Sequence, residues 1–294
     1  MPDNRQVEIG LKLRETKLHN GILFNSEAWS STPDKLIKRL EQVDVAALKA
    51  LVAGHSKCPT AFYFLEFGTL MVRHKVMIKR LMYHHHIISR EDDELVKKVY
   101  NKQKENCSKG DWIETVRTDF EFINVIMDEN TIKCTPKVQY KKFVNEKVKE
   151  AAFQSYLKLP ETSKKKMKGL QYNEFKIQAY MNTSIFSTQE INLLFSLRSK
   201  CYPAKMNFKK LHRGDLKCFL KCDADETQFH IFQDCEPIKS RLGISIYPKL
   251  EDIYKNITLQ KNAVLIFIKI DHIRKQLKES ILPGGLVARA PANT

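Results

Sequence analysis

The sequence predicts a mostly α-helical fold. Apolar residues recur at helical spacing in several stretches, and helix-capping residues precede many of these stretches. The 294 residues include only 10 Gly and 10 Pro, which are too few turn-forming residues for a fold of many strands. The 43% of hydrophobic residues suffice to form a core. We therefore expect a helical bundle, then a small cysteine-rich module and C-terminal helices.

The first predicted helix begins at Thr32, Pro33 and Asp34. Thr can cap a helix, Pro fits its first turn, and Asp favours the positive end of the helix dipole. Apolar residues then continue at helical spacing up to Gly54: Leu36, Ile37, Leu40, Val43, Ala47, Leu48 and Leu51.

Two apolar helices are predicted next, one from Pro59 to Gly68 and a longer one over residues 70–88. Consecutive residues of a helix point in different directions, so the run His84, His85, His86 does not predict a metal site. Ser89, followed by three acidic residues, predicts the cap of an exposed helix that ends near residue 106.

Four further helices are predicted. One covers residues 111–126, and a long one follows the cap at Thr135 and Pro136, with an apolar face made of Val138, Phe143, Val144, Val148, Ala152 and Leu157. Ser187 and Glu190 form a capping box before the apolar stretch 191–197, and the last helix covers residues 259–280. The lysine run 164–168 indicates a solvated linker, with nucleic-acid contact as the alternative.

The motif with the clearest chemistry is Cys218-x3-Cys222-x7-His230-x4-Cys235. Three thiolates and one imidazole satisfy a tetrahedral Zn²⁺ ion in a closed structural site, which leaves no position for catalysis. Disulfides are disfavoured in a reducing compartment, so the alternative is that some of these cysteines are buried thiols. We predict one Zn²⁺ held by Cys218, Cys222, His230 and Cys235.

The charge indicates a polyanionic partner. Fifty Lys and Arg against 34 Asp and Glu give a formal net charge of +16. RNA or DNA binds favourably to such a positive surface, because binding releases counterions from the phosphates. An acidic membrane surface, or solubility alone, is the alternative. The longest apolar run, residues 263–268, is far below the ~20 residues of a bilayer span, and the start carries no apolar signal core, so an intracellular location, nuclear or cytoplasmic, is expected.

The candidate phosphate contacts are basic residues of the helix over residues 70–88 and of the surroundings of the cysteine motif. Phenylalanines interleave with the second group and could stack on unpaired bases, although they are more often the core of such a module. The candidates are Arg73, Lys75, Lys79, Arg80, Lys209, Lys210, Arg213, Lys217 and Lys221.

Several stretches resemble one family of proteins. EIGLKLRETKLHNGILFNSEAW (residues 8–29), HSKCPTAFYFLEFGTL (55–70) and INLLFSLRSK (191–200) resemble the region after the catalytic palm in reverse transcriptases of non-LTR (LINE-class) retrotransposons, and the cysteine spacing is similar to their closing motif. The resemblance implies a thumb-like helical region (1–90), a helical linker (91–205), a CCHC zinc-knuckle-like module (206–240), a C-terminal helical segment (241–282) and a flexible tail (283–294).

The resemblance implies a nucleic-acid-handling tail without a polymerase. The palm of these enzymes needs an aromatic residue before an Asp-Asp pair that binds metal ions, whereas Asp92 and Asp93 follow Arg90 and Glu91. We expect a non-catalytic fragment that binds nucleic acid, with RNA favoured over DNA. The alternatives are that it serves a palm encoded elsewhere, that it is a helical protein-interaction scaffold, or that it is a decayed remnant of a transposable element.

Overall fold

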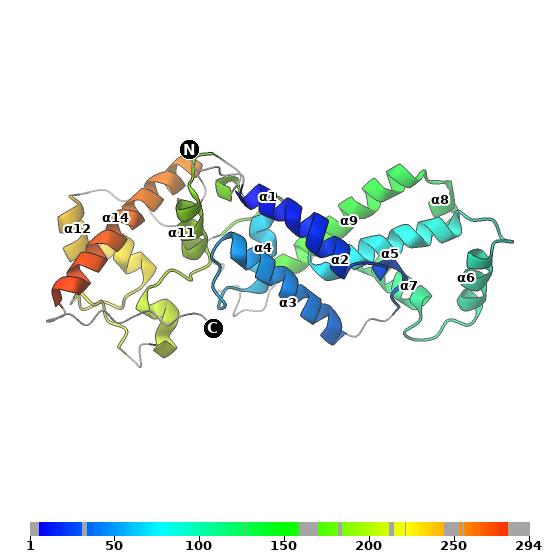
Figure 1. Ribbon diagram of the computed structural model, residues 1–294, viewed down its shortest axis with the longest axis horizontal. Helices are drawn as coiled ribbons and strands as arrows, with labels where there is room; N and C mark the ends of the chain where they lie inside the picture. Colours follow the sequence, from blue (N-terminus) through cyan, green and yellow to red (C-terminus); the bar gives the residue numbers. More distant parts are fainter. Residues whose placement is uncertain are drawn as a thin grey trace. The chain divides into compact units, whose positions relative to one another are not determined.

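The computed structural model is mostly helical, as expected (Figure 1). It describes residues 6–30, 34–126, 128–158, 170–181, 184–211, 215–220, 222–243, 253–254 and 256–281, with the backbone alone for 209–211 and 278–281. The predicted cap at Thr32 and Pro33, the lysine run 164–168 and the tail 283–294 lie outside the described residues. Within the described part, no helix is both long enough and apolar enough to span a bilayer.

The chain divides into two compact units, residues 1–192 (the N-terminal unit) and 193–294 (the C-terminal unit). This division differs from the boundaries expected at residues 90, 205 and 240. The reason is packing: helices on both sides of residue 90 share one core, and so do the cysteine module and the helix after it. The helices of the N-terminal unit begin with α1 (Gln6–Leu13), η1 (Arg14–His19), α2 (Asn20–Ile22), η2 (Ser26–Ala28) and α3 (Asp34–Leu51).

Helix α4 (Thr60–Phe67) is apolar on all sides and is buried almost entirely, as such a helix must be. It ends at Gly68, as predicted, with φ of +57°. A Cβ atom at this glycine would lie 2.1 Å from the backbone of Lys176, so no other residue fits. The close approach is the point where the strap of residues 170–181 crosses, through a bridge between Phe67 and Ile177.

Helix α5 (Val72–Ile88) is the centre of the N-terminal unit and contacts α3, α6, α7, α8 and α9 (Figure 1). The long helix α9 (Lys137–Leu157) packs on it through a face that the sequence predicts only in part. Val138, Phe143 and Leu157 were expected on this face, but they are 81%, 38% and 38% exposed. The buried face instead consists of Tyr140, Val144, Val148, Ala152 and Tyr156.

The connection after α5 also differs from the prediction. Ser89 does not begin the next helix: its Oγ donates to the carbonyl of His85 at 2.8 Å, and α6 (Leu95–Glu105) begins after Glu94. Asp92 and Asp93 lie in the exposed turn between the two helices. The remaining helices of this part are α7 (Trp112–Phe122) and α8 (Glu129–Cys134).

The capping box before α11 (Thr188–Arg198) is confirmed. The Ser187 backbone N–H donates to Glu190 Oε2 at 2.7 Å, and the Glu190 N–H donates to Ser187 Oγ at 3.3 Å. Two backbone donors that the helix itself leaves unpaired are thus satisfied reciprocally. The turn η3 (Ala179–Met181) precedes this helix.

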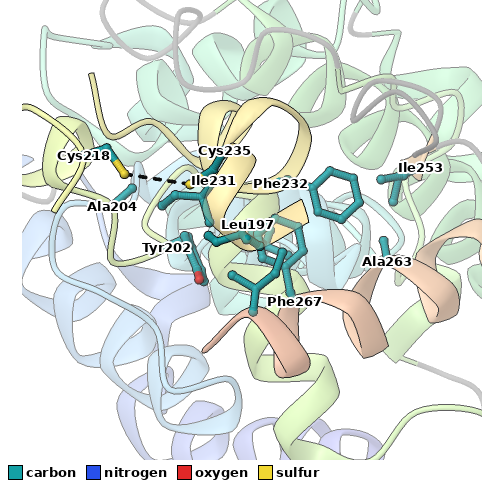
Figure 2. Packing of buried hydrophobic residues seen from close by; sticks show 12 residues of the cluster. Leu197, Tyr202, Ala204, Cys218, Ile231, Phe232, Cys235, Ile253, Ala263 and Phe267 are labelled. Carbon is teal, nitrogen blue, oxygen red and sulfur yellow. Dashed lines mark hydrogen bonds between the residues drawn. The ribbon is translucent and has the colours of Figure 1, made fainter. Parts of the chain in front are cut away.

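The C-terminal unit is a short chain folded around one apolar cluster. Its elements are η4 (Lys205–Leu211), η5 (His230–Asp234), α12 (Glu236–Leu242) and α14 (Ile257–Ile281). Phe232 of η5 stacks on Phe267 of α14 with ring centroids 4.7 Å apart, and Tyr202 meets Phe267 edge-on (Figure 2). Cys218 and Cys235 belong to the same cluster, so the cysteine motif and α14 fold as one body.

Candidate metal centre

A short hairpin-like loop holds the first two cysteines. Lys217 and Asp225 form an isolated antiparallel bridge, and the Cys218 N–H donates to the Ala224 carbonyl at 2.9 Å. The Glu226 N–H closes the loop with a bond to the Leu216 carbonyl at 2.7 Å. These bonds bring Cys222 back beside Cys218.

A helical turn holds the second pair of donors. Thr227 Oγ1 accepts the His230 N–H at 2.8 Å, which caps the turn η5. At its end the Cys235 N–H donates to the His230 carbonyl at 2.8 Å, and the Cys235 carbonyl accepts from Ile238 as α12 begins. The π-helical winding of η5 thus places His230 and Cys235 side by side.

The four predicted ligands come together. One donor atom from each of Cys218, Cys222, His230 and Cys235 lies within 4.8 Å of all the others. The Sγ atom of Cys235 is 3.6 Å from that of Cys222 and 4.0 Å from that of Cys218. Figure 2 shows the contact between Cys235 and Cys218. Metal–sulfur bonds of about 2.3 Å at tetrahedral angles require sulfur separations of about 3.8 Å. These two sulfur separations are close to that value, so the cluster could hold a metal ion.

The imidazole provides an independent test of this fit. The Nε2 atom of His230 is buried, and among the residues that the structure describes no hydrogen-bond partner is found for it. A buried polar atom without a partner costs about 1–3 kcal/mol, so native proteins rarely leave one. A metal ion bound by the neighbouring sulfurs would supply the missing partner.

The thiols are coupled through their contacts. The hydrogen bond from Cys235 lowers the pKa of Cys218 to about 5, and the same contact raises the pKa of Cys235. Burial raises the pKa of Cys222. One thiolate is thus favoured within the cluster, and a bound cation would favour the other two, because metal binding displaces thiol protons.

A second set of polar residues ties this loop to α14. Glu226 is 2% exposed, and its Oε2 accepts the N–H of Phe219 within the cysteine loop at 3.2 Å. Its Oε1 accepts from Arg274 Nη2 of α14 at 2.8 Å, and Arg274 Nη1 donates to the Tyr202 hydroxyl at 3.1 Å. The guanidinium also lies over the Phe219 ring. The motif alone does not reveal these residues, because Arg274 lies 48 positions from Glu226 and 72 positions from Tyr202.

The basic residues of α5 that we predicted to contact phosphate are mostly bonded to other groups of the protein. Arg73 binds Glu41 with two hydrogen bonds of 2.6 and 2.9 Å. Lys75 donates to Glu15, and Lys79 donates to the Leu23 carbonyl at 2.7 Å. The Arg80 side chain is 7% exposed and pairs with Asp119 at 2.7 Å, so its predicted contact with phosphate is replaced by a structural role.

The predicted contacts near the cysteine motif are described only in part. The Lys217 side chain is 59% exposed and lies 3.8 Å from Asp225. Arg213 and Lys221 lie outside the described residues, and so do the side chains of Lys209 and Lys210. Among the phenylalanines, Phe232 is buried in the core, whereas Phe229 is 50% exposed and can face a ligand.

The histidine run behaves as expected from helix geometry. His84 Nε2 lies 3.1 Å from the Tyr100 hydroxyl, and His85 Nε2 lies 2.9 Å from the Thr135 carbonyl. The two rings therefore have different partners on different elements. They do not converge on one site.

The N-terminal unit contains a buried ionic cluster that the sequence does not announce. Arg14 binds both carboxylate oxygens of Asp44 at 2.6 Å, and His19 Nε2 lies 2.7 Å from Asp44 Oδ1. Burial alone would raise the pKa of Asp44, but hydrogen bonds from His19 and Arg14 outweigh it and hold the pKa below its ordinary value. The partners are 25 and 30 positions apart, so spacing gives no signal.

Comparison of the chain with models of known protein families, with curated proteins and with solved structures gives no match. The likeness to non-LTR reverse transcriptases therefore depends only on the sequence stretches and the cysteine spacing quoted above.

Proposed function

We propose that this protein is a non-catalytic nucleic-acid-binding module whose C-terminal unit is closed by a structural Zn²⁺ ion. The observation that carries the proposal is the convergence of Cys218, Cys222, His230 and Cys235 in a chain of net charge +16. Small modules closed by a metal often present cations and aromatic rings to single-stranded nucleic acid. RNA is the favoured ligand, because the resemblance to non-LTR reverse transcriptases points to an RNA-handling tail.

Zinc is the metal that suits the donor set best. Thiolates select zinc, copper(I) or iron–sulfur clusters, and a mixed set of three thiolates with one imidazole is a common structural zinc site. When bound, the ion supplies folding energy and not a reaction, because all four positions are taken by the protein. Within the cluster, His230 Nε2 would complete its bonding through the ion.

The cations available to RNA are those that the fold leaves exposed. On α9, the lysines lie mostly at the surface, outside the face that packs on α5. Near the metal cluster, Lys217 and the ring of Phe229 are both exposed. The residues that we expect to meet phosphate are thus Lys217 and the α9 lysines Lys137, Lys141, Lys142 and Lys149.

The test is binding of a single-stranded RNA to the full chain as salt rises. Each phosphate that the protein neutralises adds about −0.7 to the slope of log affinity against log salt for a single strand. We expect a slope of about −3 when four or more phosphates are neutralised, and a shallower slope in a Lys137→Ala, Lys141→Ala, Lys142→Ala triple variant. An affinity that does not change with salt, or no binding at all, would refute the proposal.

A further inference from the structure

The N-terminal unit contains a pocket of about 430 Å³ that the proposed zinc module does not explain. Its walls come from η1 and α2, from the connection between α4 and α5, from α5 and from α9. The helices α2, α5 and α9 can be followed in Figure 1. This volume lies in the range of about 300–1,000 Å³ that is usual for small-molecule sites.

The charged residues that line the pocket are mostly basic. They are Lys75, Lys79 and Lys149, together with the acidic Glu15. Lys79 also lies 3.6 Å from the carboxylate of Glu27, which is not among the lining residues. Lys75 donates to Glu15 Oε1 at 3.1 Å, and Lys79 donates to a backbone carbonyl. Lys149 lies on the exposed side of α9. The lining therefore carries an excess of positive charge, which favours an anionic ligand.

The ammonium of Lys75 is held in place by a hydrogen bond to His19. The imidazole of His19 lies between it and the buried carboxylate of Asp44, with Nδ1 2.8 Å from Lys75 Nζ and Nε2 2.7 Å from Asp44 Oδ1. His19 therefore donates from Nε2 to Asp44 and accepts at Nδ1 from Lys75. An ammonium has three hydrogens, and the bonds to Glu15 and His19 use two, so the third is left for a ligand. Burial lowers the pKa of Lys75, and a bound anion would oppose this.

The pocket is also lined by apolar residues and by two amides. Leu23 and Leu70 are buried, and Ile78 is half-buried. The amides of Asn20 and Asn145 each donate one hydrogen to a backbone carbonyl of the preceding helical turn, at 3.0 and 2.7 Å. Each amide keeps a second N–H and an oxygen, the pair of groups that recognises the edge of a nucleobase.

From this arrangement we infer that the pocket binds one nucleotide, with its phosphate at Lys75, Lys79 and Lys149 and its base between the apolar wall and the two amides. The nucleotide can be a free mononucleotide or one unit of a single strand. The strand form rests on the nucleic-acid binding proposed above, whereas the free form does not.

The test uses AMP as the probe and the full-length chain. Calorimetric titration at low salt is expected to show AMP binding to the wild type, with weaker binding of adenosine and of inorganic phosphate, because each fills half of the pocket. Lys149→Ala should weaken AMP binding about fivefold, because one charged hydrogen bond to the phosphate is removed. The control is Lys147→Ala on the same helix: this lysine pairs with Glu150 outside the pocket, and its removal should leave the affinity unchanged.

A single-stranded RNA arm separates the two forms. If AMP displaces the RNA from the chain, the pocket holds a unit of the strand; if AMP binds without displacing the RNA, the site takes a free nucleotide. The inference is overturned if AMP does not bind, or if both variants lose AMP affinity equally. RNA binding that persists without AMP binding would refute the pocket alone, whereas loss of both would refute the proposed function as well.

Discussion

Each of the two units has a buried polar cluster, and the clusters differ in what completes them. In the N-terminal unit, the Asp44 carboxylate accepts hydrogen bonds from Arg14 and His19. Its charge and its hydrogen-bonding capacity are therefore matched by protein groups. In the C-terminal unit, three thiols and His230 converge, yet His230 Nε2 has no hydrogen-bond partner within the described part of the chain. The first cluster is complete once the chain folds, whereas we propose that the second is completed by a metal ion.

The difference has a consequence for stability. A buried ionic cluster contributes modestly, because desolvation offsets most of its attraction, although breaking it is costly. A structural zinc site contributes its whole binding free energy to folding, since the unfolded chain has no preformed site. We therefore expect a chelator to destabilise the C-terminal unit and not the N-terminal unit. The loss of a buried charge at Asp44 should instead destabilise the N-terminal unit.

Removal of the metal should have the largest effect. A strong chelator is expected to abolish the protection of α12 and α14 against hydrogen exchange while α5 stays protected, because structural Zn²⁺ supplies about 10–16 kcal/mol in small modules. Exchange followed by mass spectrometry on the full chain measures both units at once. Equal protection of α14 with and without chelator would show that the cluster needs no ion.

The reverse perturbation is Asp44→Ala. It leaves Arg14 buried without its counter-charge, so we expect the N-terminal unit to lose about 3–5 kcal/mol of unfolding free energy. The control is Glu8→Ala, which removes an exposed pair with Lys12 and should cost less than about 0.5 kcal/mol. Denaturant unfolding provides the values, and a loss below about 1 kcal/mol for Asp44→Ala would contradict the assigned role.

Acid should destabilise the N-terminal unit through His84. Burial lowers the pKa of this histidine from 6.5 to about 4. Between these values the unfolded chain binds a proton that the folded chain does not, so this contribution to stability is present above pH 6.5 and is lost as pH falls towards 4. His84→Gln should reduce the pH dependence of α5 exchange by about 1.4 kcal/mol per pH unit in this window. His272→Gln in the other unit is the control, and an identical slope in both variants would contradict the prediction.

A smaller effect is expected from the residues that support the cysteine loop. Glu226→Gln keeps the shape of the side chain but weakens its bonds to Arg274 and to the Phe219 N–H. Groups that orient a metal loop typically change metal affinity by about 10–100-fold, and we expect about tenfold here. Competition with a zinc-binding dye measures it. Asp223→Asn in the exposed part of the same loop is the matched control, and equal affinities would remove the supporting role.

The smallest predicted effect concerns the capping box. Ser187→Ala removes the Oγ acceptor for the Glu190 N–H at the start of α11, which should cost about 1 kcal/mol. Thermal unfolding should show it as a modest fall in melting temperature. Thr188→Ala, one residue later, serves as control, and a larger effect in the control would contradict the cap.

The sequence is a good guide where a local rule decides the structure. Gly68 and the capping box at Ser187 act over one helical turn, and both were predicted correctly. The convergence of Cys218, Cys222, His230 and Cys235 was predictable for the same reason, because these four candidate ligands lie within a short stretch of chain and their chemistry is specific. A spacing motif of this kind therefore identifies both the candidate ligands and the kind of site that they could form.

Prediction fails where distant segments decide. The buried face of α9 depends on what α5 presents, so Val138 and Phe143 were assigned to a core that excludes them. Serine is a residue type that often caps the start of a helix. Ser89, however, directly follows the end of α5, and its hydroxyl donates to the His85 carbonyl of that helix. Arg80 was assigned to phosphate because a basic residue is usually exposed, whereas tertiary packing buries it against Asp119.

The central claim is that a metal ion completes the C-terminal cluster, and its most direct test is the metal content of the chain purified without chelators. Elemental analysis should find one zinc ion per chain in the wild type and in Cys107→Ser, and none in Cys235→Ser. A wild-type protein that is folded and metal-free would contradict the account, because the cluster would then be complete with protein atoms alone.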